Sequence, residues 1–382
     1  MHGHCCVHHL VAEINGVAFV SYATVSGSDM QDARLPMLDV FAGIGGFSLA
    51  LRDICRTVGY CEISQPCQEV LRNNMRRGLL ETAPIYDDIA SLPIEQLTQV
   101  KIVTAGFPCQ DISLLNKDGI GLHGEKSKLF FTFAKAVRKL PNIRHILLEN
   151  SPQVKTKGLS TILSLLKRAG FHHIAFGNFS AAEVGALHVR RRWFCLASRD
   201  STRLLPECHS QAYDWSGKEP CRRLLPRRTD QHAMKNKQCC RLLGNAVVPT
   251  CVMYAYNCLR IACSEGAHKT GDDITVLNGK VTKLSGKSIP GRPAKILPYP
   301  TMRYGDGIYK RGYWMTPVYS SWCQYRKHTQ RSTWLLSNQI YYEIHTPVPK
   351  GVQRTMLSTV RIINPCFIEY LMGYPMGWVS CT

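Results

Sequence analysis

Four side chains in this sequence have the types and positions that bond-forming chemistry requires. Cys109 follows Gly106-Phe107-Pro108 at the end of one apolar run, Glu149 ends a second, and Arg190 and Arg192 precede a third. A cysteine thiolate is a nucleophile, and a buried carboxyl group has a raised proton affinity. Guanidinium groups at alternate strand positions share one side and can converge on an anion or a carbonyl oxygen. The types and spacing predict a nucleophilic site.

Each of these residues also has an ordinary structural explanation. Cys109 is one of 17 cysteines, and a randomly chosen cysteine more often packs in a core than reacts. Glu149 could cap a helix, and three successive arginines usually form a solvated basic face. The other motifs along the chain favour the chemical interpretation.

The elements that must position these residues alternate between strand and helix from Leu35 onward. Short apolar runs predict strands, and amphipathic runs predict helices. The predicted strands cover residues 37–41, 57–61, 84–86, 101–105, 143–148, 174–179 and 193–197, and the predicted helices cover 47–54, 129–140, 159–169 and 251–263. This alternation predicts an α/β fold, in which ligands bind beyond the carboxyl ends of the strands, where Cys109 and Glu149 fall.

A glycine turn, Gly43-Ile44-Gly45-Gly46, follows the first of these strands. Glycines there let a ligand lie against the backbone at the amino end of a helix. Glu62 ends the next strand about twenty residues on, where a carboxylate typically binds ribose hydroxyls. Asp88 ends the third, although a solvated turn residue would also explain it. By itself, the sequence predicts a nucleotide-like pocket.

Composition restricts the partners. The 382 residues suffice for two domains, and 47 Lys and Arg against 27 Asp and Glu leave a net charge of +20, which favours nucleic acid. We expect no membrane association, because no stretch approaches eighteen apolar residues. The cysteines form no disulfide framework and no signal peptide precedes them, so we expect a reducing, intracellular setting.

The first 33 residues are predicted to be an N-terminal extension. Asn15-Gly16 between two apolar runs predicts a hairpin, and the terminal His and Cys residues lack metal-site spacing. Cys208, His209, Cys221, Cys239 and Cys240 also lack it, so no metal is predicted. We expect residues 200–237 to form an exposed basic connection near DNA.

Five motifs in register over residues 35–250 resemble those of the DNA cytosine carbon-5 methyltransferases. They are Asp39 to Phe47, Gly106 to Gln110, Glu149-Asn150, His188 to Arg192 and Gly244 to Pro249. The chain departs from the family at Leu187-His188, where Pro-Gln is usual, and at Ser151, where valine is common. The segment 364–375 follows the last motif instead of preceding it, a permuted order that resembles phage and viral members.

The resemblance implies a doubly wound, Rossmann-like methyltransferase fold with S-adenosyl-L-methionine as cofactor. Cys109 would attack carbon 6 of a flipped cytosine, and Glu149 would hydrogen-bond or protonate ring nitrogen N3. Arg192, supported by Arg190, would hold the O2 carbonyl. Residues implied to bind the cofactor are Phe41, Gly43, Ile44, Gly45, Gly46, Glu62, Ile63, Asp88, Ile89, Pro108, Asn245 and Ala246.

The resemblance also implies a division into a catalytic domain, 34–264, and a smaller mixed target-recognition domain, 265–382. Residues 303–334 interleave bases with aromatic rings, so we expect them to grip duplex DNA. A fragment 34–264 is expected to fold and bind cofactor, with 364–374 bracing the recognition domain against the catalytic one. We expect a monomer in a restriction-modification setting, located in the cytoplasm or nucleoid, or in the nucleus for a eukaryotic virus. RNA methylation and an inactive DNA-binding relic remain alternatives.

Overall fold

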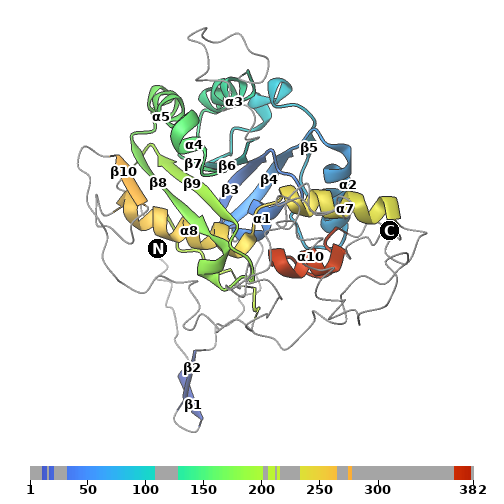
Figure 1. The fold of residues 1–382 in the computed structure, drawn as a ribbon. Coiled ribbons are helices and arrows are strands. Elements are labelled where there is room, and N and C mark those ends of the chain that lie inside the picture. The colour runs from blue at the N-terminus through green and yellow to red at the C-terminus, as the bar shows by residue number, and fades with distance from the viewer. Residues whose placement is uncertain are drawn as a thin grey trace, which may run out of the picture. The chain divides into compact units, whose positions relative to one another are not determined.

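The computed structural model describes residues 11–14, 17–20, 32–107, 128–200, 205–210, 213–215, 233–264, 274–277 and 365–379. The chain divides into two compact units, residues 1–33 and 34–382. In the first, β1 (Val11–Ile14) and β2 (Val17–Val20) pair antiparallel with Ile14 opposite Val17 (Figure 1). This register confirms the predicted two-residue hairpin.

The second unit is built on an eight-stranded sheet with the order β10-β8-β9-β7-β6-β3-β4-β5. Strands β5, β4, β3, β6 and β7 run parallel, whereas β9 pairs antiparallel with both β7 and β8, and β10 pairs antiparallel with β8. The strands are β3 (Leu35–Val40), β4 (Cys55–Cys61), β5 (Ile85–Tyr86), β6 (Ile102–Gly106), β7 (His145–Asn150), β8 (His173–Ser180), β9 (Arg191–Ser198) and β10 (Ile274–Leu277).

Helices cover both faces of this sheet (Figure 1). One buried cluster includes Phe47, Val70 and Leu259 from helices on one face, and a second includes Phe133 and Ile162 from the other. The first face carries α1 (Gly46–Ala50), α2 (Gln65–Arg76), α7 (Ala233–Asn245), α8 (Pro249–Ser264) and α10 (Pro365–Met372), and the second carries α3 (Lys128–Lys139), α4 (Val154–Lys157) and α5 (Leu159–Arg168). The α/β fold with a doubly wound sheet is therefore confirmed.

The run Gln238–Cys263 is long and apolar enough to cross a membrane by length and composition, which the sequence inspection had not recognised. In this protein 78% of its most apolar window is buried. Its α8 portion packs on β8, β9 and α1, as a core helix does. The apolar composition is thus explained by packing.

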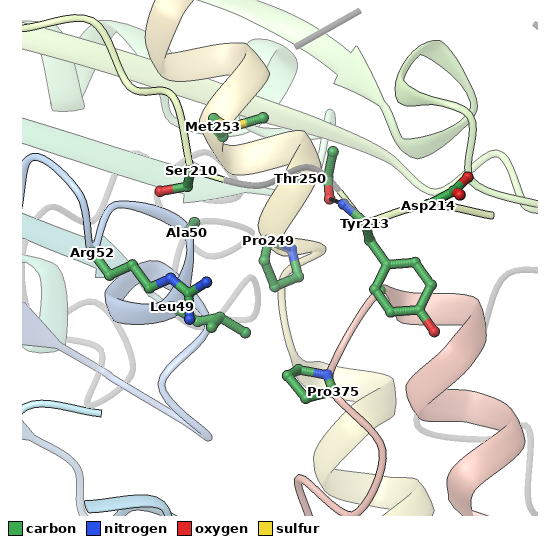
Figure 2. Close-up of a pocket in the computed structure, with 11 residues that line it drawn as sticks. Leu49, Ala50, Arg52, Ser210, Tyr213, Asp214, Pro249, Thr250, Met253 and Pro375 are labelled. Carbon is green, nitrogen blue, oxygen red and sulfur yellow. Dashed lines mark hydrogen bonds between the residues drawn. The ribbon is translucent and has the colours of Figure 1, made fainter. Parts of the chain in front are cut away.

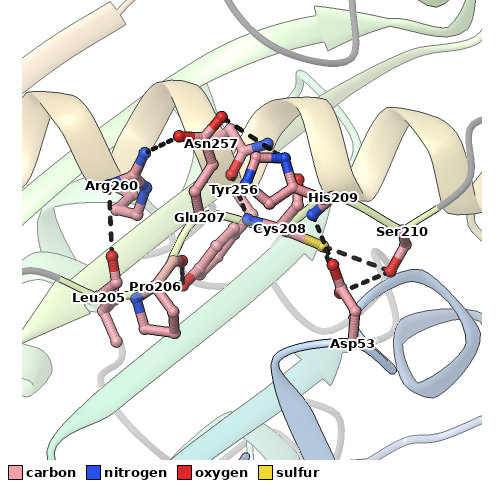
Figure 3. Close-up of polar contacts among 10 residues, drawn as sticks. All are labelled: Asp53, Leu205, Pro206, Glu207, Cys208, His209, Ser210, Tyr256, Asn257 and Arg260. Atoms are coloured by element: carbon pink, nitrogen blue, oxygen red, sulfur yellow. Dashed lines mark hydrogen bonds and ion pairs between the residues drawn. The ribbon is translucent and has the colours of Figure 1, made fainter. Parts of the chain in front are cut away.

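The described part of the expected basic connection is partly buried rather than a fully exposed loop. Asn257 of α8 accepts a hydrogen bond from the Cys208 amide at 3.0 Å and donates one to the Cys208 carbonyl at 2.9 Å (Figure 3). The Ser210 hydroxyl donates to Asp53 at 2.6 Å, and Leu205 and Trp215 are buried. The expectation of exposure is therefore wrong for Leu205, Cys208 and Trp215, whereas Pro206, His209 and Asp214 are exposed as expected.

The described carboxyl-terminal residues, 365–379, contribute to the core of the second unit. The Trp378 indole donates to the Ile44 carbonyl at 2.8 Å, and Asn74 of α2 donates to the Trp378 carbonyl at 3.1 Å. Leu49 of α1, Pro249 of α8 and Pro375 line one cavity of about 260 Å³ (Figure 2).

This placement corrects the expected boundary at residue 264. The described segments 274–277 and 365–379 are parts of the eight-stranded sheet and its core, not of a separate domain. The segment expected to form the recognition surface, 303–334, lies outside the described residues.

Candidate functional site

An open cavity of about 830 Å³ lies at the carboxyl ends of β3, β4, β6 and β7. Most of the predicted site residues line it, namely Phe41, Gly43, Ile44, Glu62, Ile63, Asp88, Ile89, Glu149, Arg190, Arg192, Asn245 and Ala246. Pro108 and Cys109 lie outside the described residues, but their neighbours Gly106 and Phe107 line the same cavity.

Glu62 organises the glycine turn in one half of the cavity. Its carboxylate accepts the Gly43 amide at 2.7 Å and the Ser64 amide at 2.8 Å. Burial raises the pKa of Glu62, and these amide hydrogen bonds oppose the rise. Gly43 has a φ of 54°, and a Cβ on it would meet nothing within 4 Å, so its exposed face is open to a ligand.

Phe41, just before this turn, is a non-glycine residue with a φ of 53°. Such a left-handed conformation costs free energy and persists where the surroundings impose it. The Phe41 ring lies 6.3 Å from that of Phe133 in α3. Phe41 therefore combines an unfavourable backbone conformation with a position in the cavity wall.

Gly45 and Gly46 are absent from the residues that line this cavity. Gly45 has a φ of 83°, and a Cβ on it would lie 2.8 Å from Leu80. A Cβ on Gly46 would collide with the Tyr374 hydroxyl and the Val247 side chain. In the described structure these two glycines permit close packing behind the turn, which differs from their predicted role in ligand contact.

The rim beside the glycine turn combines apolar and acidic groups. The Ile63 side chain is 75% exposed, whereas Ile89 is buried. The exposed Asp88 accepts the Ala90 amide at 3.0 Å and so caps the short 3-10 helix η1 (Ile89–Ser91). A capping carboxylate keeps spare lone pairs, so Asp88 fits both the structural and the binding interpretation.

The direction of β9 creates the other half of the cavity. Because β9 runs antiparallel to β7, its first residues lie at the carboxyl ends of the parallel strands. The Arg192 Nε atom is thereby 3.1 Å from Glu149 Oε1. Burial raises the pKa of Glu149, and the positive charges of Arg192 and then Arg190 oppose the rise.

The two arginines line one cavity but have different partners. Arg190 precedes β9 with a φ of 22°, and its Nη2 atom donates to the carbonyls of Gly244 at 3.1 Å and Ala246 at 2.6 Å. Burial and then the charge of Arg192 lower the pKa of Arg190 to about 9. Simple strand alternation therefore does not describe how these two side chains reach the cavity.

Two further positions matter that were not among the predicted site residues. The Asn150 side chain donates to the Phe107 carbonyl at 2.9 Å, which anchors the chain one residue before Pro108. The buried His188 hydrogen-bonds through Nε2 to the Leu371 carbonyl at 2.8 Å. Asn150 was signalled by its place beside Glu149, whereas the partner of His188 depends on tertiary structure.

Comparisons with known proteins show which family the chain matches. The family model described as "C-5 cytosine-specific DNA methylase" matches residues 35–237. The chain is 27% identical to the Type II methyltransferase M.CviJI of Paramecium bursaria Chlorella virus IL3A, over 76% of this chain and 72% of that protein. It is 31% identical to the Type II methyltransferase M2.BsuMI of Bacillus subtilis (strain 168), over 43% of this chain and 42% of that protein.

The chain thus matches less than half the length of the bacterial relative. Among solved structures, the S. pombe Dnmt2 methyltransferase is 22% identical, with a TM-score of 0.39, over 52% of this chain and 62% of that one.

Proposed function

Because the chain belongs to the C-5 cytosine-specific DNA methylase family and is a DNA cytosine-5 methyltransferase, we propose that it methylates cytosine within a specific short sequence of duplex DNA. The observation that carries the proposal is the single cavity at the strand ends. It joins a nucleotide-type half, built on Glu62 and the Gly43 turn, to the Glu149–Arg192 pair.

The residues present fit S-adenosyl-L-methionine. The open face of Gly43 permits close backbone approach, Glu62 and Asp88 offer carboxylate oxygens for hydroxyl and amine groups, and Ile63 offers an apolar surface. Asn245, at the end of α7, also lines the cavity. When bound, the cofactor supplies an electrophilic methyl group on a sulfonium.

The chain's own groups would activate the target base. The Cys109 thiolate adds to carbon 6 of cytosine, which forms a carbon–sulfur bond and makes carbon 5 electron-rich. Glu149, whose pKa is raised by burial, donates a proton to N3, while Arg192 holds the O2 oxygen. After carbon 5 has been methylated, a base removes the carbon 5 proton, and the electron pair of that bond forms the carbon 5–carbon 6 double bond as the thiolate is expelled. N3 then returns its proton to Glu149.

This chemistry requires a base that has left the duplex stack. Flipping costs a few kcal/mol, which protein contacts with the DNA must offset. The net charge of +20 supplies electrostatic attraction to phosphates, and residues 303–334 have the basic and aromatic composition of such a surface. We therefore propose a monomeric, intracellular, DNA-associated enzyme. The Type II relatives favour a role in restriction-modification.

The test is methyl transfer from radiolabelled cofactor to duplex DNA and to RNA in parallel, with bisulfite sequencing to locate the product. Labelling of DNA at a defined sequence is expected. Cys109→Ser should abolish turnover and covalent trapping on DNA that contains 5-fluorocytosine, while Cys366→Ser, a half-buried thiol outside the cavity, should retain both. A retained adduct in Cys109→Ser, labelling of RNA alone, or no labelling would each contradict the proposal.

A further inference from the structure

Arg190 lies at the junction of three segments that are distant in the sequence. Its guanidinium donates to the carbonyls of Gly244 and Ala246, on either side of Asn245. The side chain is 4% exposed, so these bonds are made out of water, where unpaired polar groups are costly. Arg190 therefore ties the arginine segment directly to the turn that closes the cofactor half.

The carboxyl-terminal segment holds both sides of this junction. The Tyr374 hydroxyl donates to the Val247 carbonyl at 3.0 Å, next to Ala246. His188, two residues before Arg190, bonds the Leu371 carbonyl at 2.8 Å. Burial and then the charge of Arg190 lower the pKa of His188 to about 3, so its ring is neutral and Nε2 carries the proton given to that carbonyl.

These contacts close a ring through residues 188–190, 244–247 and 371–374, which we name the Arg190 ring. Neither His188 nor Tyr374 lines the large cavity, but Arg190, Gly244 and Ala246 do. The Tyr374 hydroxyl lies so close to Gly46 that a Cβ there would collide with it, which extends the ring to the amino end of α1. A shift of the carboxyl-terminal segment would thus move groups in both halves of the cavity.

We propose that the Arg190 ring couples cofactor binding to cytosine binding, and that Tyr374 and His188 are its positioning residues. Asn245 lies within the cofactor half, whereas Arg192, two residues beyond Arg190, pairs with Glu149 in the cytosine half. A ligand that orders one half orders the ring, and the other half then binds with less ordering still to be done. Such coupling is reciprocal by thermodynamic necessity.

This inference rests on the proposed function and deepens it. The segment 365–379 contributes no residue to the large cavity, yet two of its residues bond the segments that do. His188 occupies the position where the DNA cytosine-5 methyltransferase family usually has glutamine. A glutamine amide can also donate one hydrogen bond, so a His188→Gln variant provides a conservative substitution for testing the ring.

The experiment compares Tyr374→Phe with Tyr256→Phe in the full chain. Both hydroxyls donate to a backbone carbonyl, Val247 at 3.0 Å and Pro206 at 2.8 Å, and both side chains are fully buried. Tyr256 lies in α8 outside the large cavity. Each change deletes one hydroxyl, so a purely structural role predicts equal effects from the two variants.

The measurement is the dissociation constant of S-adenosylhomocysteine by calorimetry, with and without a saturating duplex that carries the site located by bisulfite sequencing. In the wild type, the duplex should tighten this constant at least fivefold. Tyr374→Phe should reduce that factor to below twofold, whereas Tyr256→Phe should retain it with a comparable fall in unfolding temperature. His188→Ala should behave as Tyr374→Phe does, and His188→Gln should restore most of the factor.

The possible failures are distinguishable. A wild type that binds no S-adenosylhomocysteine overturns the proposed function and this inference with it. A wild type that binds and methylates but shows no tightening by DNA overturns the inference alone. The same holds if Tyr374→Phe keeps the wild-type factor, or if His188→Gln loses as much as His188→Ala.

Discussion

Arg192 and Glu149 form an ion pair between adjacent antiparallel strands, with Arg192 Nε 3.1 Å from Glu149 Oε1. Phe194 is the register partner of Glu149, so Arg192 reaches it diagonally from two residues away. The side chains of Arg192 and Glu149 are 24% and 12% exposed, which leaves both reachable from the cavity. Because β9 runs antiparallel to β7, a carboxyl group and a guanidinium lie where one polar ring can contact both.

Glu149→Gln should lower kcat by about a hundredfold or more, the usual contribution of a positioned proton donor. The amide keeps the size of the carboxyl group but cannot deliver a proton to N3. Because Glu149 lies in the cytosine half, calorimetric affinity for S-adenosylhomocysteine should change less than twofold.

The matched control for this change is Glu183→Gln. Glu183 accepts the Ser180 amide in a capping box at the end of β8 and does not line the cavity. It should alter stability slightly and kcat hardly at all. A loss of cofactor affinity in Glu149→Gln as large as its loss of kcat would contradict the role of Glu149 as the proton donor to N3.

Glu62→Gln should weaken S-adenosylhomocysteine binding by about tenfold while affecting kcat less. The carboxylate accepts two backbone amides, from Gly43 and Ser64, and a glutamine side chain can accept only through its single oxygen. The glycine turn then loses a charge-assisted bond on the side facing the ligand. Calorimetry measures the effect directly.

Asp88→Asn is the companion variant, because asparagine retains the oxygen that caps the Ala90 amide. It should weaken binding less than threefold, whereas Asp88→Ala should weaken it more. Equal affinities of the Glu62→Gln and wild-type proteins would place the ribose site elsewhere.

The strands were predictable because their signals are local. Runs such as Ile102 to Gly106 are β-branched, buried and ended by glycine, and β6 forms there with a shift of one residue at each end. Tertiary pairing was not predictable in the same way. Nothing local in residues 193–197 distinguishes a strand that enters the sheet antiparallel between β7 and β8 from one that continues it in parallel.

The candidate site was predictable to the extent that it lies at strand ends. Glu62 and Glu149 needed only the strand boundaries and a topological rule. The different partners of Arg190 and Arg192 depend on a turn more than fifty residues away, and α2 and α7 were not predicted at all. The carboxyl-terminal segment was misassigned because the sequence shows it as apolar but not which surface it covers.

Asp39→Asn should change the pH dependence of folding stability. Asp39 is fully buried with hydroxyl partners Ser48 and Thr104, each at 2.8 Å, and burial raises its pKa from 3.8 to about 7. A raised folded-state pKa means that its stabilising contribution is complete below pH 3.8 and is lost as pH rises toward about 7. An asparagine cannot titrate, so this loss should disappear.

Urea unfolding at several pH values measures the difference in unfolding free energy between Asp39→Asn and wild type. Relative to wild type, Asp39→Asn should gain about 2 kcal/mol in unfolding free energy between pH 5 and pH 7. Asp53→Asn is the contrast: burial acts to raise the pKa of Asp53, but hydrogen bonds from Ser210, Cys208 and His209 outweigh it and lower the pKa. Its variant should lose stability at neutral pH and approach wild type in acid. Parallel pH curves for Asp39→Asn and wild type would contradict the assignment.

The fragment 34–264 should fail to fold, which reverses the expectation drawn from motif order. Truncation there removes a set of side chains that are each at most 4% exposed, namely Ile368, Tyr370, Leu371, Met372, Tyr374, Trp378 and Val379. Burying one large apolar side chain contributes roughly 1.5 to 3 kcal/mol, so their sum rivals the 5 to 15 kcal/mol that stabilises a typical domain. It also removes the bond from Trp378 to the Ile44 carbonyl inside the glycine turn. The fragment 34–382, which lacks only the amino-terminal unit, is the comparison.

Near-ultraviolet circular dichroism and S-adenosylhomocysteine calorimetry should show that 34–382 is folded and binds the ligand, and that 34–264 has neither property. A short fragment that binds as tightly as the long one would mean that residues 365–379 cover the catalytic core without supporting it.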